Sequence, residues 1–563
     1  MDFMRIIKMI WNLSAGTTTP AKSKTESKPD YTRSFATLSK AGTFLTSMAL
    51  SISIASANLL PPENPFLADS TYPITHVTSA QQGAIAIKGP EDRNRRLSDA
   101  EKEYIYTGPS HLIFSISGQY DNGKRVIWSA GSDRLIKQDY DSFEVLDTLM
   151  LREDEGWDEA WSEERMKKVA NGWEPFRVYN ALQEMMRFAE AGAIYPMMDA
   201  DNNFYLGSTD GTIAVYSDSV EGDPSSQISL KHRYQIKEPV TGKVNGFNIS
   251  YDGYIIAVTD DGWLVAMSRD FKEQFQLKLE GAPNTSDNKE DPLNGWVRNS
   301  FSMDSNGMTY VVSTDYMHGV KWTGKGWSQN VKDGAWIAPY SNTKGRGSGA
   351  TPSLMGFGDE DKLVAITDGD DLMNLTLFWR EEIPSDWKAL PGEDRRVAGK
   401  IAANMAREDL KKVQSEQSVA VYGYGAVIVN NEPPSMPFYA PEIIAPVFVG
   451  LLATEEKFQP FGIQKFVWNP ENRTLSQEWV NNDISSPNSV PVIAAYNDVI
   501  YTGGVRNGEW TLEALDWNTG KEKFHWVLGD NKFNTNFSPL AIDPQGRITY
   551  GTTWGRVRLN PKP

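Results

Sequence analysis

The chain has 563 residues, of which 40% are hydrophobic, 11% aromatic and 23% charged, and this composition excludes a disordered tail, a collagen and a coiled coil. Its 73 acidic and 56 basic residues give a formal charge of −17. Nucleic acid is therefore not an expected partner, because binding its phosphate backbone needs clustered Lys and Arg. Cysteine is absent, which excludes disulfides, thiolate metal sites, iron–sulfur clusters and thiol nucleophiles.

The N-terminal region predicts export. Residues 41–57, AGTFLTSMALSISIASA, form an apolar stretch that ends in Ala55-Ser56-Ala57, a pattern typical of a signal peptide cleaved before Asn58. An uncleaved membrane anchor is the alternative, although a stretch of about 17 residues is at the short end for a spanning helix. A leader of about 40 residues precedes it, longer than an ordinary n-region, so either the signal is extended or the start codon is misassigned. We expect 1–57 to be a leader and signal peptide, no stable membrane span after processing, and a periplasmic or secreted protein.

A degenerate repeat recurs along the rest of the chain. Each copy has a turn rich in Asp, Asn and Gly, then a short run of β-branched or aromatic residues, then a second turn such as Thr-Asp-Gly. The copies begin at Asp121, Asp201, Asp252, Asp304, Glu360, Tyr424, Asn497 and Asp543. Their spacing fits a four-stranded propeller blade with insertions.

Several copies continue into a second hairpin that ends in an aromatic residue, at 267–275, 320–327, 466–479 and 514–526. Short strands joined by such turns favour a closed ring of sheets, because closure removes the exposed sheet edges. We therefore predict an all-β fold, an eight-bladed β-propeller with seven blades as the alternative, formed by residues 58–563 as a single domain.

Two insertions, 152–190 and 392–453, interrupt the repeat. The second half of the first insertion repeats apolar residues at three- and four-residue spacing, which predicts a helix. Residues 392–416 carry alternating charges typical of a solvated helix. Residues 433–453 are apolar, but five prolines break them and argue against a spanning helix. We expect the insertions to form lids or docking surfaces.

The segment Ala514-Leu-Asp-Trp-Asn-Thr-Gly-Lys-Glu-Lys-Phe-His-Trp526 resembles the A-x-D-x-x-T-G-x-x-x-W repeat of pyrroloquinoline-quinone-type, or quinoprotein-like, propellers. Phe524 and Trp526 depart from the family's aromatic spacing, and the other copies match only the hairpin pattern. The resemblance implies a propeller fold. It also implies, for the dehydrogenases of that superfamily, a quinone beneath a vicinal pair of cysteines, which this chain lacks.

Candidate binding residues follow from the predicted fold. In a propeller, the turn between the second and third strands of a blade and the segment leading into its first strand lie on one face, around the central channel. These positions supply His111, Asn299, Arg346, Asp368, Asp370, Asn488 and Asn536. Carboxylates and amides there suit a hard cation, a polyol or a cationic group. Turn geometry alone is the competing interpretation for each Asp, because Asp-Gly turns favour this residue for its backbone conformation.

Motifs that would identify a reaction are absent. Residues 345–350, GRGSGA, match the written form of a dinucleotide fingerprint but lead into a predicted strand, so we interpret them as a loop entering an inner strand. No GxSxG or HExxH occurs, and the five histidines lack metal-ligand spacing. The sequence therefore identifies no catalytic residue and no metal site, and neither calcium nor quinone has a specific motif.

Two functions from different classes remain. The first is an exported propeller that binds a small ligand or a partner protein through its central funnel face. The alternative is an enzyme, either a quinoprotein-like oxidoreductase or a calcium-assisted lactonase-type hydrolase. In that alternative a funnel Asp acts as the base, and Arg346 or His111 stabilises charge.

Overall fold

The computed structural model describes residues 59–108, 111–131, 133–151, 195–282, 297–436 and 452–562. The chain divides into two compact units, Met1–Ala57 and Asn58–Pro563, and every described residue belongs to the second. The predicted leader and signal peptide and the insertion at 152–190 lie outside the described residues. Besides strands, the described part contains the short 3₁₀ helices η2 (Asp99–Glu101), η5 (Val331–Asp333), η7 (Glu456–Phe458) and η8 (Asn531–Phe533).

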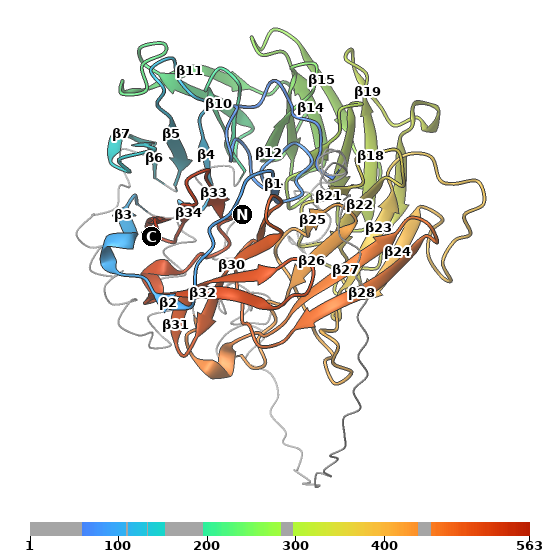
Figure 1. The fold of residues 1–563 in the computed structure, drawn as a ribbon. Coiled ribbons are helices and arrows are strands. Elements are labelled where there is room, and N and C mark those ends of the chain that lie inside the picture. The colour runs from blue at the N-terminus through green and yellow to red at the C-terminus, as the bar shows by residue number, and fades with distance from the viewer. Residues whose placement is uncertain are drawn as a thin grey trace, which may run out of the picture. The chain divides into compact units, whose positions relative to one another are not determined.

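The described strands form eight sheets, which we number in chain order (Figure 1). Sheet 1 comprises β4 (Phe114–Ile116), β5 (Val126–Ala130), β6 (Arg134–Asp139) and β7 (Val145–Met150). Sheet 2 comprises β8 (Met197–Met198), β9 (Phe204–Gly207), β10 (Thr212–Asp218) and β11 (Ile228–Gln235). Sheet 3 comprises β12 (Val244–Ile249), β13 (Ile255–Thr259), β14 (Trp263–Met267) and β15 (Gln274–Lys278). Sheet 4 comprises β16 (Ser302–Met303), β17 (Met308–Val312), β18 (Tyr316–Trp322), β19 (Trp327–Ser328) and β20 (Trp336–Pro339).

The remaining four sheets continue the same plan. Sheet 5 comprises β21 (Ser353–Met355), β22 (Leu363–Thr367), β23 (Asn374–Trp379) and β24 (Val397–Ala402). Sheet 6 comprises β25 (Ala420–Tyr422), β26 (Gly425–Val429), β27 (Ile463–Asn469) and β28 (Thr474–Asn481). Sheet 7 comprises β29 (Val492–Ala494), β30 (Val499–Arg506), β31 (Glu509–Asp516) and β32 (Glu522–Gly529), flanked by β1 (Ala84–Ile85) and β2 (Arg95–Arg96). Sheet 8 comprises β33 (Ala541–Ile542), β34 (Ile548–Gly551), β35 (Gly555–Leu559) and β3 (Lys102–Tyr106).

Every copy of the repeat occupies the same place in its sheet. The strand inside each copy is the second one of its sheet: β5, β9, β13, β17, β22, β26, β30 and β34. The four predicted outer hairpins are the third and fourth strands β14–β15, β18–β19, β27–β28 and β31–β32. The all-β class and the strand order within each repeat are therefore confirmed.

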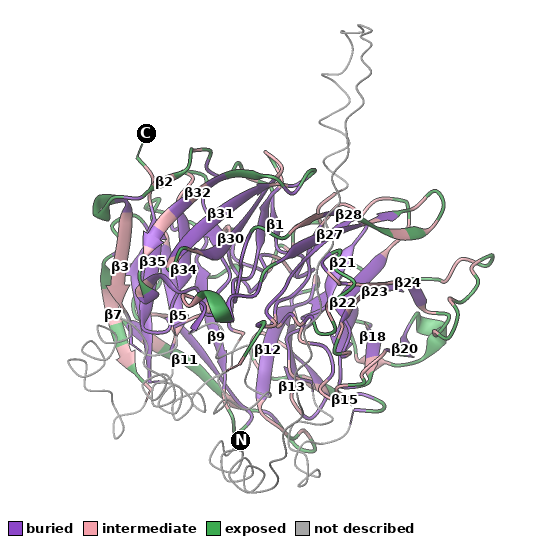
Figure 2. Ribbon diagram, turned by 90° about the horizontal axis from the view of Figure 1, so that it is seen from below, coloured by how far each residue is buried: buried purple, intermediate pink, exposed green. Residues whose placement is uncertain are grey.

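Burial decreases from the second strands to the fourth strands (Figure 2). All five residues of β13 are buried, whereas β28 alternates mostly between exposed and half-buried residues. A strand that packs on both faces needs apolar side chains on both, while a fourth strand faces solvent along its edge. This difference explains why the second strands give the clearest signal in the sequence.

The eight sheets follow one another in a circle. β4 contacts β8, β9 contacts β12, β15 contacts β19, β21 contacts β25, and β25 contacts β29. Sheets 4 and 5 share a hydrophobic cluster that includes Tyr310 and Leu354. Sheets 7 and 8 are bridged by Val490 and Pro539. In Figure 1, the labels of the first strands β4, β12, β25 and β33 lie toward the middle of the view. This circular order of antiparallel sheets defines a β-propeller.

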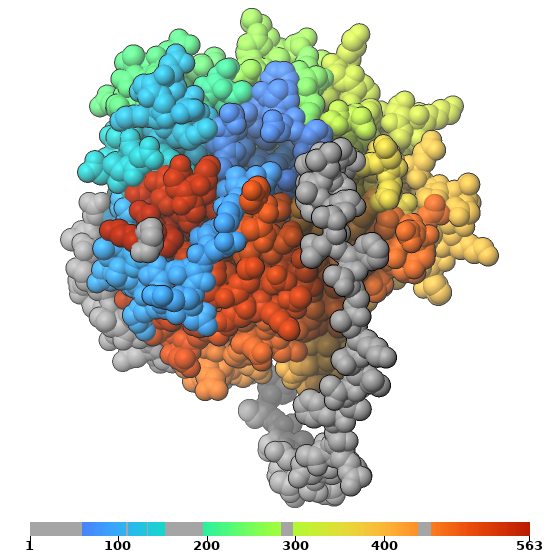
Figure 3. All heavy atoms as spheres, viewed as in Figure 1, coloured from blue at the N-terminus to red at the C-terminus, as the bar shows by residue number. Residues whose placement is uncertain are grey.

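Sheet 8 closes the circle by joining the two ends of the described chain. β3 precedes sheet 1 in the sequence but pairs antiparallel with β35, with Glu103 opposite Arg558. Their side chains form an ion pair at 2.5 Å. In Figure 3 the red C-terminal residues lie beside the blue residues of the N-terminal part. Closure of this kind leaves no end of the ring unpaired.

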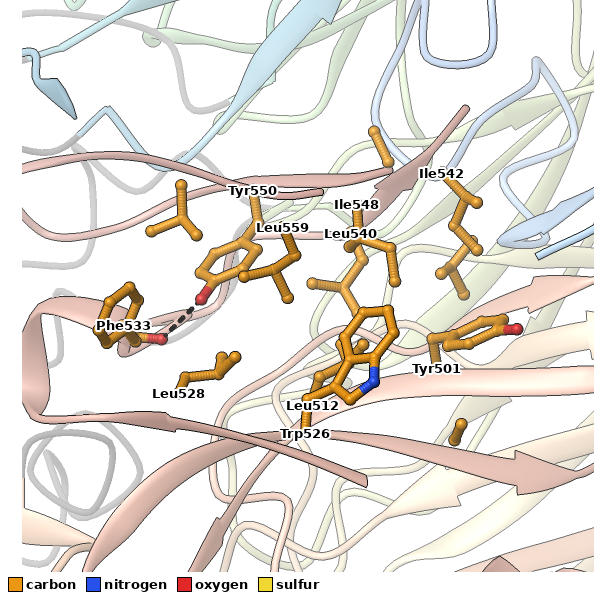
Figure 4. Packing of buried hydrophobic residues seen from close by; sticks show 14 of the residues in the cluster. Tyr501, Leu512, Trp526, Leu528, Phe533, Leu540, Ile542, Ile548, Tyr550 and Leu559 are labelled. Atoms are coloured by element: carbon orange, nitrogen blue, oxygen red, sulfur yellow. Dashed lines mark hydrogen bonds between the residues drawn. The ribbon is translucent and has the colours of Figure 1, made fainter. Parts of the chain in front are cut away.

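The largest hydrophobic cluster fills the space where sheets 7, 8 and 1 meet. Figure 4 shows part of it, with Trp526 of β32 among Leu540, Ile548 and other side chains. The hydroxyl of Tyr550 donates a hydrogen bond of 3.1 Å to the carbonyl of Phe533 (Figure 4). The aromatic residue of the 514–526 repeat is thus a packing residue between neighbouring sheets.

The predicted helix over 392–416 is wrong. The described residues of this range contain no helix, and Val397–Ala402 forms β24, the fourth strand of sheet 5. The alternating charges have other partners: the Arg396 guanidinium lies 4.9 Å from the Trp336 ring, and Lys400 pairs with Glu393 at 2.8 Å. Alternation between polar and apolar residues suits a solvated edge strand as well as a helix surface. Of the apolar stretch that follows, residues 437–451 lie outside the described ranges.

Candidate functional site

In this topology, one end of every sheet lies on the same face of the propeller. A four-stranded antiparallel sheet ends at the side where it began, so successive first strands start on the same side. The turn between the second and third strands returns to that side as well. We call this surface the axial face, and it is the face on which the sequence placed the candidate binding residues.

A pocket on the axial face spans sheets 4, 5 and 6. The pocket opens to solvent, and its enclosed part has room for about one water molecule. Its walls come from the segments that lead into β16, β21 and β25 and from the turn between β22 and β23. The polar side chains that line it most prominently are Arg298, Lys344, Arg346, Asp368, Gln414 and Glu416.

Asp368 is the buried carboxylate of this pocket, with 4% of the residue exposed. Its Oδ1 accepts the backbone N–H of Asn374 at 2.8 Å, and its Oδ2 accepts the Asn374 amide at 2.6 Å. The Lys400 ammonium is 3.9 Å from Oδ2. Burial dominates over these stabilising contacts and raises the pKa of Asp368 to about 6. The group therefore changes charge close to neutral pH.

Asp370 lies in the same turn as Asp368, but its side chain forms hydrogen bonds that stabilise the wall of the pocket. It accepts the hydroxyl of Ser341 at 2.6 Å and both the backbone N–H and the hydroxyl of Thr343, at 3.1 and 2.8 Å. Burial would raise its pKa, but these hydrogen bonds outweigh burial and hold the pKa below its ordinary value. Asp370 therefore stays ionised and positions the loop that carries Lys344 and Arg346.

An ion pair spans the pocket between sheets 4 and 6. The Arg298 Nη2 lies 2.5 Å from the Glu416 Oε2, and Nη1 donates to the Arg346 carbonyl at 3.4 Å. The two charged side chains are about one quarter exposed. Besides this ion pair, the charged side chains of the lining are Lys344, Arg346 and Asp368. Groups of both signs therefore lie in the pocket wall.

The predicted asparagines lie on the axial face but outside the pocket. Asn299 donates to the Ser348 carbonyl at 3.1 Å and ties sheet 4 to sheet 5. Asn488 donates to the Asn534 side chain at 2.9 Å and ties sheet 7 to sheet 8. Asn536 donates within sheet 8 to a threonine hydroxyl at 3.0 Å. All three are buried, so their contacts hold neighbouring edges in register.

His111 lies on the opposite side of the circle from the pocket, in the segment that leads into β4. It is fully buried, and its Nδ1 is 2.9 Å from the Ser129 hydroxyl. Burial, with the nearby charges of Arg556 and Arg134, keeps its pKa well below the ordinary value. The structure thus brings Arg346 and Asp368 together and places His111 in different surroundings.

Other turn carboxylates serve the backbone, as the competing interpretation holds. Asp304 Oδ1 accepts the backbone N–H groups of Asn306 and Met308, each at 3.0 Å, and Oδ2 accepts the Tyr310 hydroxyl at 2.9 Å. Asp199 and Asp543 accept two backbone N–H groups in the same positions of their turns. These residues fix the turn between first and second strands.

The pocket does not fit the cofactors considered. Its described lining has no aromatic side chain, and the chain has no cysteine, so the flat surfaces that would sandwich a quinone are missing there. Its cations also disfavour calcium, which needs several oxygen ligands. Among the described residues, Glu513, Glu522 and His525 could approach one ion. Arg506 pairs with both glutamates at 2.6 Å, so this group is a salt-bridge network.

Four of these polar lining residues are not among the residues predicted from the sequence: Arg298, Lys344, Gln414 and Glu416. Arg298 precedes the predicted Asn299, and Lys344 shares a loop with Arg346, so both occupy positions that the predicted topology assigns to the axial face. Glu416 was not predicted as an axial-face residue, because the charge pattern of residues 392–416 predicts a helix. Recognition of β25 as a first strand would have placed Glu416 beside the others.

Fold and pocket together define a β-propeller with a charged pocket on its axial face. No family model matches the chain. Over 509 residues, covering 89% of both proteins, it is 29% identical to an uncharacterized protein of Archaeoglobus fulgidus. Within the described ranges, no helix has the length and apolar character needed to cross a membrane.

Two solved structures are similar to the chain at low sequence identity. A europium-containing methanol dehydrogenase shows 8% identity and a TM-score of 0.45, covering 86% of this chain and 90% of the dehydrogenase. BamB from Moraxella catarrhalis shows 11% identity and a TM-score of 0.32, covering 65% of this chain and 95% of BamB. These likenesses are weak, and the fold assignment depends on the order and contacts of the sheets.

Proposed function

We propose that the chain is an exported eight-bladed β-propeller that binds a small polar ligand in its axial-face pocket. Each of the eight sheets is counted as one blade. The observation that carries the binding function is the convergence of charged side chains from three consecutive sheets on one pocket. A pocket lined by a few convergent polar groups, one of them with a raised pKa, is the usual hypothesis for a binding site.

The charges define the ligand chemistry. Lys344 and Arg346 supply cationic donors, whereas Asp368 supplies a carboxylate whose pKa is about 6. A small molecule with a carboxylate or similar anionic group at one end and a hydrogen-bond donor at the other fits this pattern. A partner protein that presents an acidic side chain to the pocket would use the same groups.

A ligand panel tests this proposal. The full chain is screened by thermal shift against amino acids, dicarboxylic acids and sugar acids, and any stabilising compound is titrated by calorimetry. We expect Arg346→Ala to weaken binding at least about tenfold, the equivalent of one charge-assisted hydrogen bond. Lys325→Ala is the matched control, because this lysine is exposed in the turn between β18 and β19. A panel without binders, or binding that survives Arg346→Ala, would contradict the proposal.

Export is supported by the apolar stretch 41–57 and the small residues before Asn58. N-terminal sequencing of the protein recovered from its native cells provides the test. We expect the mature chain to begin at Asn58 and to be found outside the cytoplasm. An intact N-terminus on cytoplasmic protein would refute this part.

A second candidate function rests on Asp368. A carboxyl with a pKa of about 6 is suited to general-base catalysis near neutral pH. A hydrolase of lactones or esters would use ionised Asp368 to activate water, with Arg346 stabilising the developing oxyanion. Hydrolysis of a lactone panel that rises with pH around 6 and is lost in Asp368→Asn would favour this function. Equal rates for the wild type and Asp368→Asn would exclude it.

A further inference from the structure

Arg556 is a buried cation without a counterion among the described residues. It lies on β35, and none of its surface is exposed. Its Nε, Nη1 and Nη2 atoms form no hydrogen bond with the described part of the chain. A guanidinium carries five N–H donors, and buried charges are normally paired because an uncompensated one strongly destabilises the fold. Arg556 therefore differs from the buried Arg134 and Arg558, which are paired with Asp133 and Glu103.

The surroundings of Arg556 leave its donor edge available. Its guanidinium carbon lies 4.4 Å from the centre of the Phe114 ring, a cation–π contact that supplies no counterion. The carboxylate of Asp133 does not balance it, because Arg134 binds both oxygens of Asp133 at 3.0 and 2.9 Å. The in-plane donors of Arg556 are thus left for another group.

Gly551 brings His111 to the same place. It pairs with Arg556 across β34 and β35, and a Cβ at Gly551 would overlap the carbonyl oxygens of His111 and Leu112. A glycine in a strand often marks the close approach of another backbone or a ligand. Here it allows the His111 backbone of sheet 1 to approach the inner edge of sheet 8.

His111 adds a second unused polar atom. Its Nδ1 faces the Ser129 hydroxyl at 2.9 Å, while its buried Nε2 has no hydrogen-bond partner in the described ranges. When Ser129 donates to Nδ1, Nε2 carries the proton and is a donor. The charge of Arg556 contributes to the lowered pKa of His111, so the imidazole and the guanidinium lie near one another at the junction of sheets 8 and 1.

We propose that this junction is a second binding site, in which Arg556 and His111 hold a small oxyanion, namely a carboxylate or phosphate group. A planar guanidinium matches either group with two parallel hydrogen bonds, and the Phe114 ring packs against it. The site is separate from the pocket of sheets 4 to 6 and does not depend on the function proposed for it.

Anion-dependent stability of the full chain provides the test. The melting temperature is measured at pH 7 in sodium phosphate, in sodium acetate and in sodium chloride at equal ionic strength. We expect phosphate or acetate to raise it saturably over chloride, by about 2 °C or more at a hundredfold excess over the dissociation constant. The anion that acts identifies the source: phosphate indicates a phosphoryl group, and acetate a carboxylate.

Two substitutions on one strand locate the effect. Arg556→Met removes the charge with similar length and should abolish the anion response. Arg558→Met is the control, since Arg558 is equally buried but ion-paired with Glu103, and it should lower stability while keeping the response. Where Arg556→Met does not fold, Arg556→Lys should raise the half-saturating anion concentration at least tenfold. Absence of a response in the wild type, or a response that either Arg556 variant retains unchanged, would overturn the proposal.

Discussion

The raised pKa of Asp368 makes a specific prediction for stability. The folded chain binds a proton at this carboxyl more tightly than the unfolded chain does, because burial raises the pKa from the ordinary 3.8 to about 6. Well below pH 4 the group is protonated in both states and does not affect the free energy of unfolding. As the pH rises from 4 to 6, the carboxyl ionises in the unfolded chain while the buried group stays protonated, so the free energy of unfolding falls.

The difference of roughly two pKa units corresponds to about 3 kcal/mol, fully developed at pH 7 and above. Asp368→Asn removes the ionisation. The variant also exchanges one acceptor for an amide beside Asn374, which adds an offset independent of pH. The free energy of unfolding of the variant, relative to the wild type, should therefore rise by about 2.4 kcal/mol between pH 4 and pH 7.

Urea unfolding at pH 4, 5, 6 and 7 measures this difference. Asp370→Asn is the matched control in the same turn. Its pKa is lowered by hydrogen bonds from Ser341 and Thr343, so its ionised form stabilises the fold and that contribution is lost only as the pH falls below the ordinary value. Asp370→Asn should therefore destabilise by a constant amount from pH 5 to 7. A flat profile for Asp368→Asn over the same range would refute the assigned burial of this carboxyl.

Two further substitutions test turns and packing. Asp304→Ala removes two backbone hydrogen bonds and leaves the buried Tyr310 hydroxyl without its partner. Urea unfolding should therefore show a free energy of unfolding lower by about 3 kcal/mol. The control Ser305→Ala, on the exposed side of the same turn, should change it little. Trp526→Ala removes a fully buried side chain from the junction of sheets 7, 8 and 1. We expect the free energy of unfolding to fall by about 3–5 kcal/mol, and by less for Trp327→Ala, because Trp327 is half-buried. Equal losses within either pair would contradict the assigned burial and contacts.

Much of the fold is predictable from sequence because local chemistry repeats. Asp304 and its equivalents accept turn N–H groups, and the second strands that follow are buried on both faces, so both features recur as residue patterns. The fourth strands are not predictable in the same way. β24 lies at a solvated edge, where Arg396 and Lys400 find partners in tertiary structure, and its charges therefore imitate a helix surface.

The binding site is less predictable, because its geometry depends on which sheets are neighbours. Arg346 and Asp368 were identified from their place in the repeat, and they line one pocket. Asn299 and Asn488 satisfy the same topological rule but tie sheets together. Only coordinates distinguish an amide that bonds the next sheet from one that faces a ligand. No pattern in the sequence identifies Arg556, because its lack of a hydrogen-bond partner depends on which residues of neighbouring sheets lie around it.

Closure of the ring is the central claim, because the axial face and both proposed sites exist only if the sheets form a circle. The cysteine-free chain allows a direct measurement. Glu103 and Arg558 are cross-strand partners on β3 and β35, a separation that a disulfide can bridge. Mild oxidation of the Glu103→Cys, Arg558→Cys double variant should give a peptide cross-link by mass spectrometry. Failure to form it, or an equal yield from Glu103→Cys combined with Thr474→Cys in sheet 6, would contradict the closed ring.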